Sequence, residues 1–204
     1  MIDQADYGVD NLPFGIISDA HRGEPRPAVA FEDKVVDLGA LVHHGVLDPE
    51  CRLGAECLLG ARTLNAFLAE GLDAWRGVRA QLQHLLRASA SLDERAAVAK
   101  ATLPRDAVTM HLPIEIGDYV DFYSSLEHAT NLGRILRPNT EPLLPNYRHL
   151  PIGYHGRSGT IVVSGTPVRR PRGQVKPPDA DPPTFDPSRL LDVELEMGWI
   201  AGPG

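Results

Sequence analysis

The chain has few cysteines and lacks any long apolar run. Cys51 and Cys57 are its only cysteines, six positions apart and without a histidine nearby. This spacing matches neither a metal-binding motif nor a disulfide framework, so we expect two reduced, partly buried thiols. No run of about 18 apolar residues is present, which argues against a membrane-spanning segment. Residues 1–6 are acidic and contain no apolar stretch typical of a secretion signal, so we expect a cytoplasmic protein.

A basic surface is also missing. Twenty Lys and Arg stand against 27 Asp and Glu, which gives a net charge of −7. Nucleic-acid binding needs a basic face that displaces counterions from phosphates, so the charge balance argues against a nucleic-acid partner. The basic run at residues 169–172 has no interleaved aromatic residues and does not change this. Hydrophobic residues make up 43% of the chain, which is enough for a core and disfavours global disorder.

Turn-forming residues are abundant, with 19 Gly and 18 Pro. They favour short strands joined by turns over a helical bundle. Strand patterns occur at 27–31 and 34–38, which flank the polar pair at 32–33 and predict a hairpin, and at 108–112. Helical patterns occur at 63–71, 75–86 and 91–100, and the apolar face expected for the second comprises Trp75, Val78, Leu82, Leu85 and Leu86. Asp73 could cap the second helix, and Ser91 with Glu94 forms a capping box for the third. We therefore expect an α+β, mainly β protein, with one domain at 1–112 and a second at 113–204.

The densest chemistry lies in residues 115–131. Asp121 and Tyr123 fall on one face of a predicted strand, and Ser124 with Glu127 matches a capping box that would start a helix running to Arg137. His128 then lies in the first turn. The partial positive charge of a helix N-terminus opposes protonation of an imidazole, and a neutral imidazole is what a general base requires. A histidine satisfied by local hydrogen bonds is the alternative.

A second carboxylate group lies near the end of the chain. Residues 190–197 alternate apolar and acidic side chains, which predicts a strand with Asp192, Glu194 and Glu196 on one face. A solvated acidic face is one interpretation. Because three like charges repel on a strand, a hard divalent cation is the other. Asp121 with Glu194 and Glu196 would offer three oxygen ligands to Mg²⁺ or Ca²⁺.

Two further side chains could contact an acidic substrate. Arg137 ends the predicted helix, and Tyr154 lies in the segment 151–157, which also carries His155 and Arg157. A guanidinium and a phenol can hold a carboxylate together. Each of them alone could equally be a surface group.

Several long motifs then follow one another in a recognisable order. They are Ile116–Ser125, His128–Asn131, Leu150–Arg157, Ser164–Pro171 and Leu191–Met197. In sequence and order they closely resemble the fumarylacetoacetase family. The resemblance implies an SH3-like N-terminal domain with helices, followed by the first part of a β-rich (β-roll) catalytic domain that forms a homodimer. It also implies hydrolysis of the C–C bond of 4-fumarylacetoacetate to fumarate and acetoacetate, the last step of tyrosine and phenylalanine degradation.

The resemblance assigns roles to individual residues. His128 corresponds to the catalytic base. The substrate contacts correspond to Tyr123, Arg137 and Tyr154, and the Mg²⁺ or Ca²⁺ ligands to Asp121, Glu194 and Glu196. Family members are much longer, and the chain ends before their fourth carboxylate ligand, their catalytic lysine and the glutamate that orients the histidine. We therefore expect a partial sequence with little or no activity. A related acylpyruvate hydrolase and a non-catalytic dimerisation fragment are the alternatives.

Overall fold

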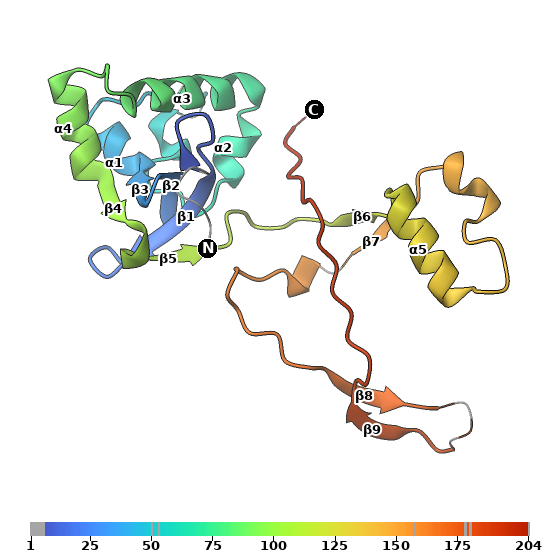
Figure 1. The fold of residues 1–204 in the computed structure, drawn as a ribbon. Helices are drawn as coiled ribbons and strands as arrows, with labels where there is room; N and C mark the ends of the chain where they lie inside the picture. The colour runs from blue at the N-terminus through green and yellow to red at the C-terminus, as the bar shows by residue number, and fades with distance from the viewer. Residues whose placement is uncertain are drawn as a thin grey trace. The chain divides into compact units, whose positions relative to one another are not determined.

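The computed structural model describes residues 7–49, 51–52, 54–156, 158–177, 179 and 181–203. The chain forms two compact units (Figure 1). Unit 1 comprises Met1–Pro113 and Val163–Gly204, and unit 2 comprises Ile114–Val162. Within the described residues, no helix combines the length and apolar character needed to cross a membrane.

A five-stranded antiparallel sheet organises unit 1, in the order β4-β3-β2-β1-β5. Its strands are β1 Phe14–Asp19, β2 Arg26–Phe31, β3 Lys34–Asp37, β4 Thr102–Pro104 and β5 Val108–His111. The polar turn at 32–33 joins β2 to β3, where Phe31 pairs with Lys34, so the expected hairpin is confirmed. Ile16 of β1 pairs with His111 of β5, which links two segments far apart in the sequence.

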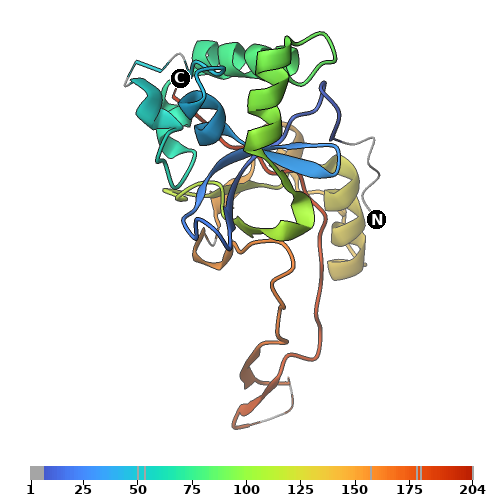
Figure 2. The same cartoon turned by 90° about the vertical axis from the view of Figure 1, so that its left-hand side faces the viewer.

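Four helices gather over one side of this sheet (Figures 1 and 2). They are α1 Leu38–His43, α2 Asn65–Ala69, α3 Leu72–Leu85 and α4 Leu92–Ala101, with 3-10 turns at Gly54–Cys57 and Arg105–Ala107. The apolar spacing in α3 correctly predicts which face of the helix is buried: Val78 and Leu82, which lie on that face, are fully buried. Together with Val29, Val36 and Leu41 they form one core cluster. Each such side chain stabilises the fold by roughly 1.5–3 kcal/mol.

The helix caps agree only in part with the sequence. Ser91 Oγ accepts the Glu94 amide and the Glu94 carboxylate accepts the Ser91 amide at 2.7 Å, so this capping box is confirmed. The bond from the Ser91 backbone is the largest cause of the lowered pKa of Glu94. Asp73 is not the cap of α3; it lies in the first turn, and Gly71 occupies the cap with φ 87°. Glycine adopts that conformation without steric cost, which is why the helix starts there.

Arg26 forms the centre of a buried ion-pair cluster in unit 1. The residue is 7% exposed, and its Nε donates to Asp37 Oδ2 at 2.5 Å while its Nη2 pairs with Asp19. Arg22 donates to the same Asp37 oxygen at 3.2 Å, and Asp37 Oδ1 caps α1 by accepting the Ala40 amide. Hydrogen bonding to Arg26, above all other causes, lowers the pKa of Asp19 from 3.8 to about 2. Opposite charges are thus paired where water is excluded.

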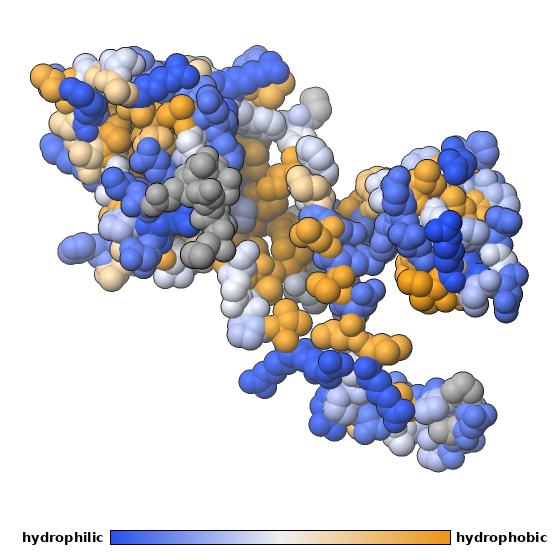
Figure 3. Space-filling model, in the orientation of Figure 1, coloured by the Kyte–Doolittle hydropathy of each residue, from blue (hydrophilic) through white to orange (hydrophobic). Residues whose placement is uncertain are grey.

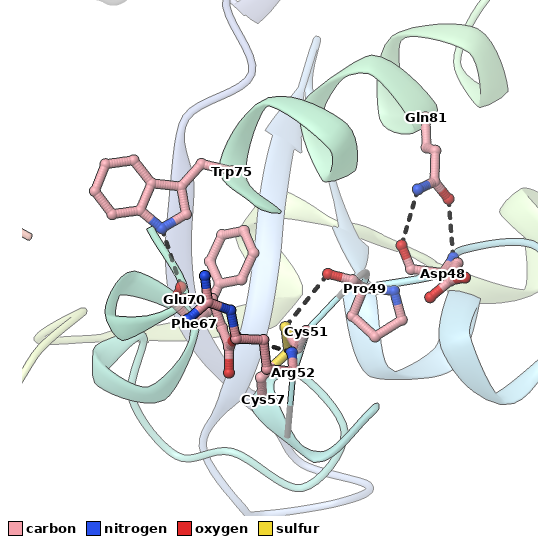
Figure 4. Close-up of a disulfide and its surroundings, with 9 residues drawn as sticks. All are labelled: Asp48, Pro49, Cys51, Arg52, Cys57, Phe67, Glu70, Trp75 and Gln81. Carbon is pink, nitrogen blue, oxygen red and sulfur yellow. Dashed lines mark hydrogen bonds between the residues drawn. A yellow bond between two sulfur atoms is a disulfide. The ribbon is translucent and has the colours of Figure 1, made fainter. Parts of the chain in front are cut away.

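Cys51 and Cys57 form a disulfide, so the expectation of two reduced thiols is wrong (Figure 4). The turn that ends in Gly54–Cys57 brings their Cα atoms to 6.5 Å, within the range that a disulfide can bridge. Spacing alone could not specify this, because the turn decides whether the two side chains face each other. Cys57 is 1% exposed and belongs to the core cluster. The two cysteines therefore no longer argue for a reducing compartment.

Hydrogen bonds hold the loop around this disulfide (Figure 4). The Arg52 amide donates to Glu70 Oε2 at 2.8 Å. The Gln81 side chain bonds both the amide and the carbonyl of Asp48, each at 2.9 Å. The loop is thereby tied to the end of α2 and to the middle of α3.

Unit 2 contains one helix and a two-stranded sheet. Its elements are β6 Val120–Phe122, α5 Leu126–Leu136, β7 Gly153–His155 and the 3-10 turns Pro145–Arg148 and Ser158–Thr160. Strands β6 and β7 are antiparallel and pair Asp121 with Tyr154. Phe122, Ile135 and Leu136 are more than half exposed, and Figure 3 shows apolar surface on this unit.

The last part of unit 1 differs from the sequence-based expectation. Strands β8 Arg172–Val175 and β9 Thr184–Pro187 pair in a hairpin. The predicted strand at 190–197 is wrong: this segment has no regular structure, and Val193 and Leu195 are 90% and 103% exposed. A strand needs a neighbour for its backbone hydrogen bonds, and the described residues supply none here. The expected mixture of α and β structure is confirmed. The expectation that β structure predominates is not, since α3 alone has 14 residues whereas the longest described strands have six.

Candidate functional site

Asp121 and Tyr154 are joined directly. The antiparallel register of β6 and β7 places them opposite each other, and the Tyr154 hydroxyl donates to Asp121 Oδ2 at 2.7 Å. The Tyr119 hydroxyl approaches the same oxygen at 3.5 Å. Both phenols approach Oδ2, and no described residue forms a hydrogen bond to Oδ1. Oδ1 is therefore the oxygen that can take a further ligand. A carboxylate fixed by hydrogen bonds in this way can orient a metal ion or a polar substrate.

Tyr123 and His128 form a second contact. Tyr123 directly follows β6, and its amide donates to the Ile152 carbonyl at 3.1 Å, which extends the pairing with the chain before β7. The ring centroids of Tyr123 and His128 lie 5.4 Å apart at 84°, an edge-to-face arrangement. Asp121 thus contacts Tyr154, and Tyr123, two residues further along the chain, contacts His128.

The start of α5 lies one residue later than predicted. Ser125, not Ser124, is the cap, and its Oγ accepts the His128 amide at 3.3 Å. The predicted capping box of Ser124 with Glu127 is therefore wrong, because the residue three positions after Ser125 is His128 and not a glutamate. His128 remains in the first turn as expected, and its backbone is fixed by the cap.

Tyr147 is a neighbour that the sequence reasoning missed. Its ring lies 6.0 Å from the Tyr123 ring at 87°, so Tyr123 contacts His128 and Tyr147. The Tyr147 hydroxyl is buried and has no hydrogen-bond partner among the residues that the structure describes. A buried polar group without a partner is uncommon and calls for a water or a ligand. No motif or spacing in the sequence marks this tyrosine.

Arg137 lies at the other end of α5. It is the C-terminal cap of the helix, is exposed, and donates through Nη2 to the Pro142 carbonyl at 2.8 Å. Gly133 permits the close approach of this loop, because a Cβ at that position would overlap the Pro142 carbonyl. With a rise of about 1.5 Å per residue, Arg137 lies roughly 13 Å along the axis from His128. The two residues therefore lie at opposite ends of α5.

Charge at the edge of the β6–β7 pair comes from Asp118 and His155. They lie 3.2 Å apart and are 71% and 78% exposed. The Tyr119 amide, followed by the charge of His155, lowers the pKa of Asp118. An exposed pair of this kind contributes little to stability. Arg157, named with His155 in the sequence analysis, lies outside the described residues.

Glu194 and Glu196 belong to unit 1, whereas Asp121 belongs to unit 2. Both glutamates are exposed in the segment that follows β9. Across the described ranges, no group of three or more His, Cys, Asp or Glu side chains is gathered closely enough to hold a metal ion. Unit 2 by itself thus supplies one of the three carboxylates expected as ligands.

Comparison with known proteins gives a consistent result. Residues 10–113 match the family model described as "Fumarylacetoacetase N-terminal". Fumarylacetoacetase of Homo sapiens is 45% identical over 206 residues, which cover 99% of this chain and 48% of the human protein. The Rattus norvegicus and Arabidopsis thaliana proteins of the same name are 43% and 41% identical, covering 99% and 97% of this chain and 48% and 47% of their own lengths.

The chain spans about half the length of the curated relatives that it matches. The similarity is not confined to the N-terminal model, since it extends over unit 2 and the Glu194–Glu196 segment. The motifs that suggested the family and the similarity measured over nearly the whole chain agree. The chain belongs to the fumarylacetoacetase family.

Proposed function

We propose that the chain contributes the base and part of the binding site of a metal-dependent C–C hydrolase. The substrate is 4-fumarylacetoacetate, and the products are fumarate and acetoacetate, which closes tyrosine and phenylalanine degradation. One observation carries the proposal: unit 2 joins Asp121 of β6 to Tyr154 of β7, and Tyr123, which follows β6, to His128 of α5. Relatives 41–45% identical over nearly the whole chain, all named fumarylacetoacetase, support it.

His128 is the proposed general base. Hydrolysis of a β-diketone requires water to attack a carbonyl, and removal of a water proton by a positioned imidazole assists the attack. The cap at Ser125 fixes the backbone of His128, and the Tyr123 ring limits the directions its imidazole can take. The buried Tyr147 hydroxyl would donate to a substrate oxygen or to an ordered water beside Tyr123.

Tyr123, Arg137 and Tyr154 are the proposed substrate contacts. Arg137 is exposed, and a guanidinium can donate two parallel hydrogen bonds to a carboxylate. Its bond to Pro142 uses Nη2, so the other donors of its guanidinium can serve that role. The separation of Arg137 and His128 along α5 suits a substrate whose carboxylate end is held away from the carbon that water attacks.

Asp121, Glu194 and Glu196 are the proposed ligands of Mg²⁺ or Ca²⁺. Carboxylate oxygens are the donors that both ions prefer, and the bond from Tyr154 leaves Asp121 Oδ1 for coordination. When bound, the cation would stabilise negative charge that develops on the substrate oxygens. Tyr154 would then orient the ligand, since it holds the second carboxylate oxygen.

The same family membership supports finer proposals on architecture. Residues 1–112 form an SH3-like domain, for which the five-stranded antiparallel sheet gives support. Residues 113–204 begin a β-roll catalytic domain of a cytoplasmic homodimer. Exposed apolar side chains on unit 2, such as Phe122 and Ile135, supply surface that such a dimer could cover. They equally favour the second candidate function, a non-catalytic dimerisation module.

The test uses a protein that carries these residues at the length of the relatives. Loss of the ultraviolet absorbance of the diketo acid is followed with and without Mg²⁺ or Ca²⁺. We expect metal-dependent turnover that falls by about 10²–10⁴-fold in His128→Ala, the usual contribution of a general base. Full turnover by His128→Ala would remove it as the base. Turnover of acylpyruvates alone would favour a related hydrolase, and no turnover of either would favour the dimerisation module.

A matched pair of variants tests the ligand role. Asp121→Asn should weaken metal binding in a calorimetric titration with Ca²⁺. Asp118→Asn should not, although it removes an aspartate only three residues away that pairs with His155. Equal effects of the two variants would contradict the assignment of Asp121.

A further inference from the structure

A groove in unit 1 is lined by none of the residues discussed so far as catalytic. It runs between the end of α3, one face of α4 and the β3–β4 edge of the sheet, with a volume of about 560 Å³. This size falls within the range of small-molecule sites. The inference drawn from it does not depend on the proposed function.

The floor of the groove is apolar and firmly packed. Leu85 is 3% exposed and belongs to the core cluster, against which Leu86, Val98 and Phe31 also pack. Thr102, the one lining hydroxyl, donates to the Val98 carbonyl at 2.6 Å and is therefore already satisfied. A ligand on this floor gains from burying an apolar body and finds few polar side-chain groups to bond.

The charged residues around the groove are all cationic. Lys34 of β3, Arg87 after α3 and Arg95 of α4 line it from three different parts of the unit, and no described carboxylate lines it. None of the three makes an ion pair with a described residue, whereas other basic side chains of unit 1, such as Arg22 and Arg26, do. Glu94, the neighbour of Arg95, is engaged by Ser91 and His84.

This local excess of three positive charges stands out because the chain as a whole carries a net charge of −7. Cations placed together without counter-charges repel one another, and an anion would relieve that repulsion. Three cations over an apolar floor match one anionic group attached to an apolar body. A nucleic acid would need a long basic track, whereas three cations around one groove suit a single small anion.

We propose that the groove binds a small organic carboxylate with an apolar body, such as a medium-chain or arylalkyl carboxylate. The apolar part lies on Leu85, Leu86 and Val98, and the carboxylate meets Lys34, Arg87 and Arg95 at the rim. Since these cations are solvent-exposed, the site is of modest affinity and weakens with salt.

The test is calorimetric and thermal titration of the 204-residue chain with octanoate. Saturable heat and a concentration-dependent rise of the melting temperature are expected. Octanamide, which has the same apolar body without the charge, should bind at least several-fold more weakly. Raising the salt concentration should weaken octanoate and leave octanamide unchanged. Absent octanoate binding, or equal affinity for the two compounds, would overturn the proposal.

Variants locate the site. Lys34→Gln, Arg87→Gln and Arg95→Gln should each weaken octanoate binding roughly 2- to 5-fold, the effect of one exposed charge pair. Lys100→Gln is the matched control, because Lys100 is an exposed cation of α4 that does not line the groove. Ala99→Trp fills the groove without altering its charge and should abolish binding. Unchanged binding by Ala99→Trp, with its melting temperature retained, would show that the ligand lies elsewhere.

Discussion

Replacing Asp19 by asparagine tests the buried ion-pair cluster of unit 1. The pKa of this carboxyl is lowered from 3.8 to about 2, chiefly by its hydrogen bond to Arg26. The Asp19 side chain is 10% exposed and that of Arg26 9%, so solvent screens the pair only slightly. A shift of this size corresponds to about 2 kcal/mol of folding free energy at neutral pH. Asp19→Asn should lose about that amount at pH 7.

The dependence on pH gives the sharper test. A carboxyl with a lowered pKa stabilises the folded state above its unfolded pKa and loses that contribution as the pH falls through the folded value. The wild-type chain should therefore lose the Asp19 contribution between about pH 4 and pH 2, while Asp19→Asn has nothing to lose there. The stability gap between them should close across this window.

The assay is urea unfolding followed by tryptophan fluorescence. Trp75 reports on unfolding, since it is part-buried and donates to the Phe67 carbonyl at 3.0 Å, whereas Trp199 is already 88% exposed in the folded chain. Free energies are compared at pH 7, 5, 4 and 3. Asp10→Asn is the control, since Asp10 is an exposed aspartate of the same unit. A gap between Asp19→Asn and wild type that stays constant from pH 7 to pH 3 would refute the reasoning, and so would no gap at pH 7.

Two further predictions concern the packing of single residues. Gly133→Ala should destabilise the chain by about 1–3 kcal/mol, because the clash of the new Cβ with the Pro142 carbonyl outweighs the usual preference for alanine in a helix. Chemical denaturation measures this loss against the control Gly117→Ala, whose Cβ would have nothing within 4 Å, and a Gly133→Ala chain more stable than wild type would contradict the prediction. Reducing the disulfide between Cys51 and Cys57 should lower the free energy of unfolding by on the order of 2 kcal/mol, the value expected for so short a loop. Thermal melts with and without dithiothreitol measure this loss, and identical melting temperatures would show that the disulfide adds no stability.

Local patterns in the sequence predicted several features correctly. The capping box at Ser91 and Glu94 fixed the start of α4, and the apolar spacing in 75–86 located the buried face of α3. The β2–β3 hairpin followed from two strand patterns around a polar turn. Each of these depends on residues within a few positions of one another, which is why sequence alone was sufficient. The motifs also identified the family before any comparison.

Features that depend on how the backbone orients residues in space were not accessible in the same way. The segment at 190–197 has the alternation of a strand, but a strand also needs a hydrogen-bonding neighbour, and pattern alone cannot provide one. The disulfide depends on how one turn orients Cys51 and Cys57, and the role of Tyr147 depends on where its ring lands beside Tyr123.

The amino-acid sequence by itself determined the family and several local elements, among them the start of α4 and the β2–β3 hairpin. Only the tertiary structure decided which of the chemistry-bearing residues meet. The register of β6 and β7 brings the Tyr154 hydroxyl to Asp121 across 33 positions. The fold of unit 1 places three cations around an apolar groove, and none of them forms an ion pair with a described residue. The physical reason is that side-chain contacts between elements depend on register and packing, which no local pattern encodes.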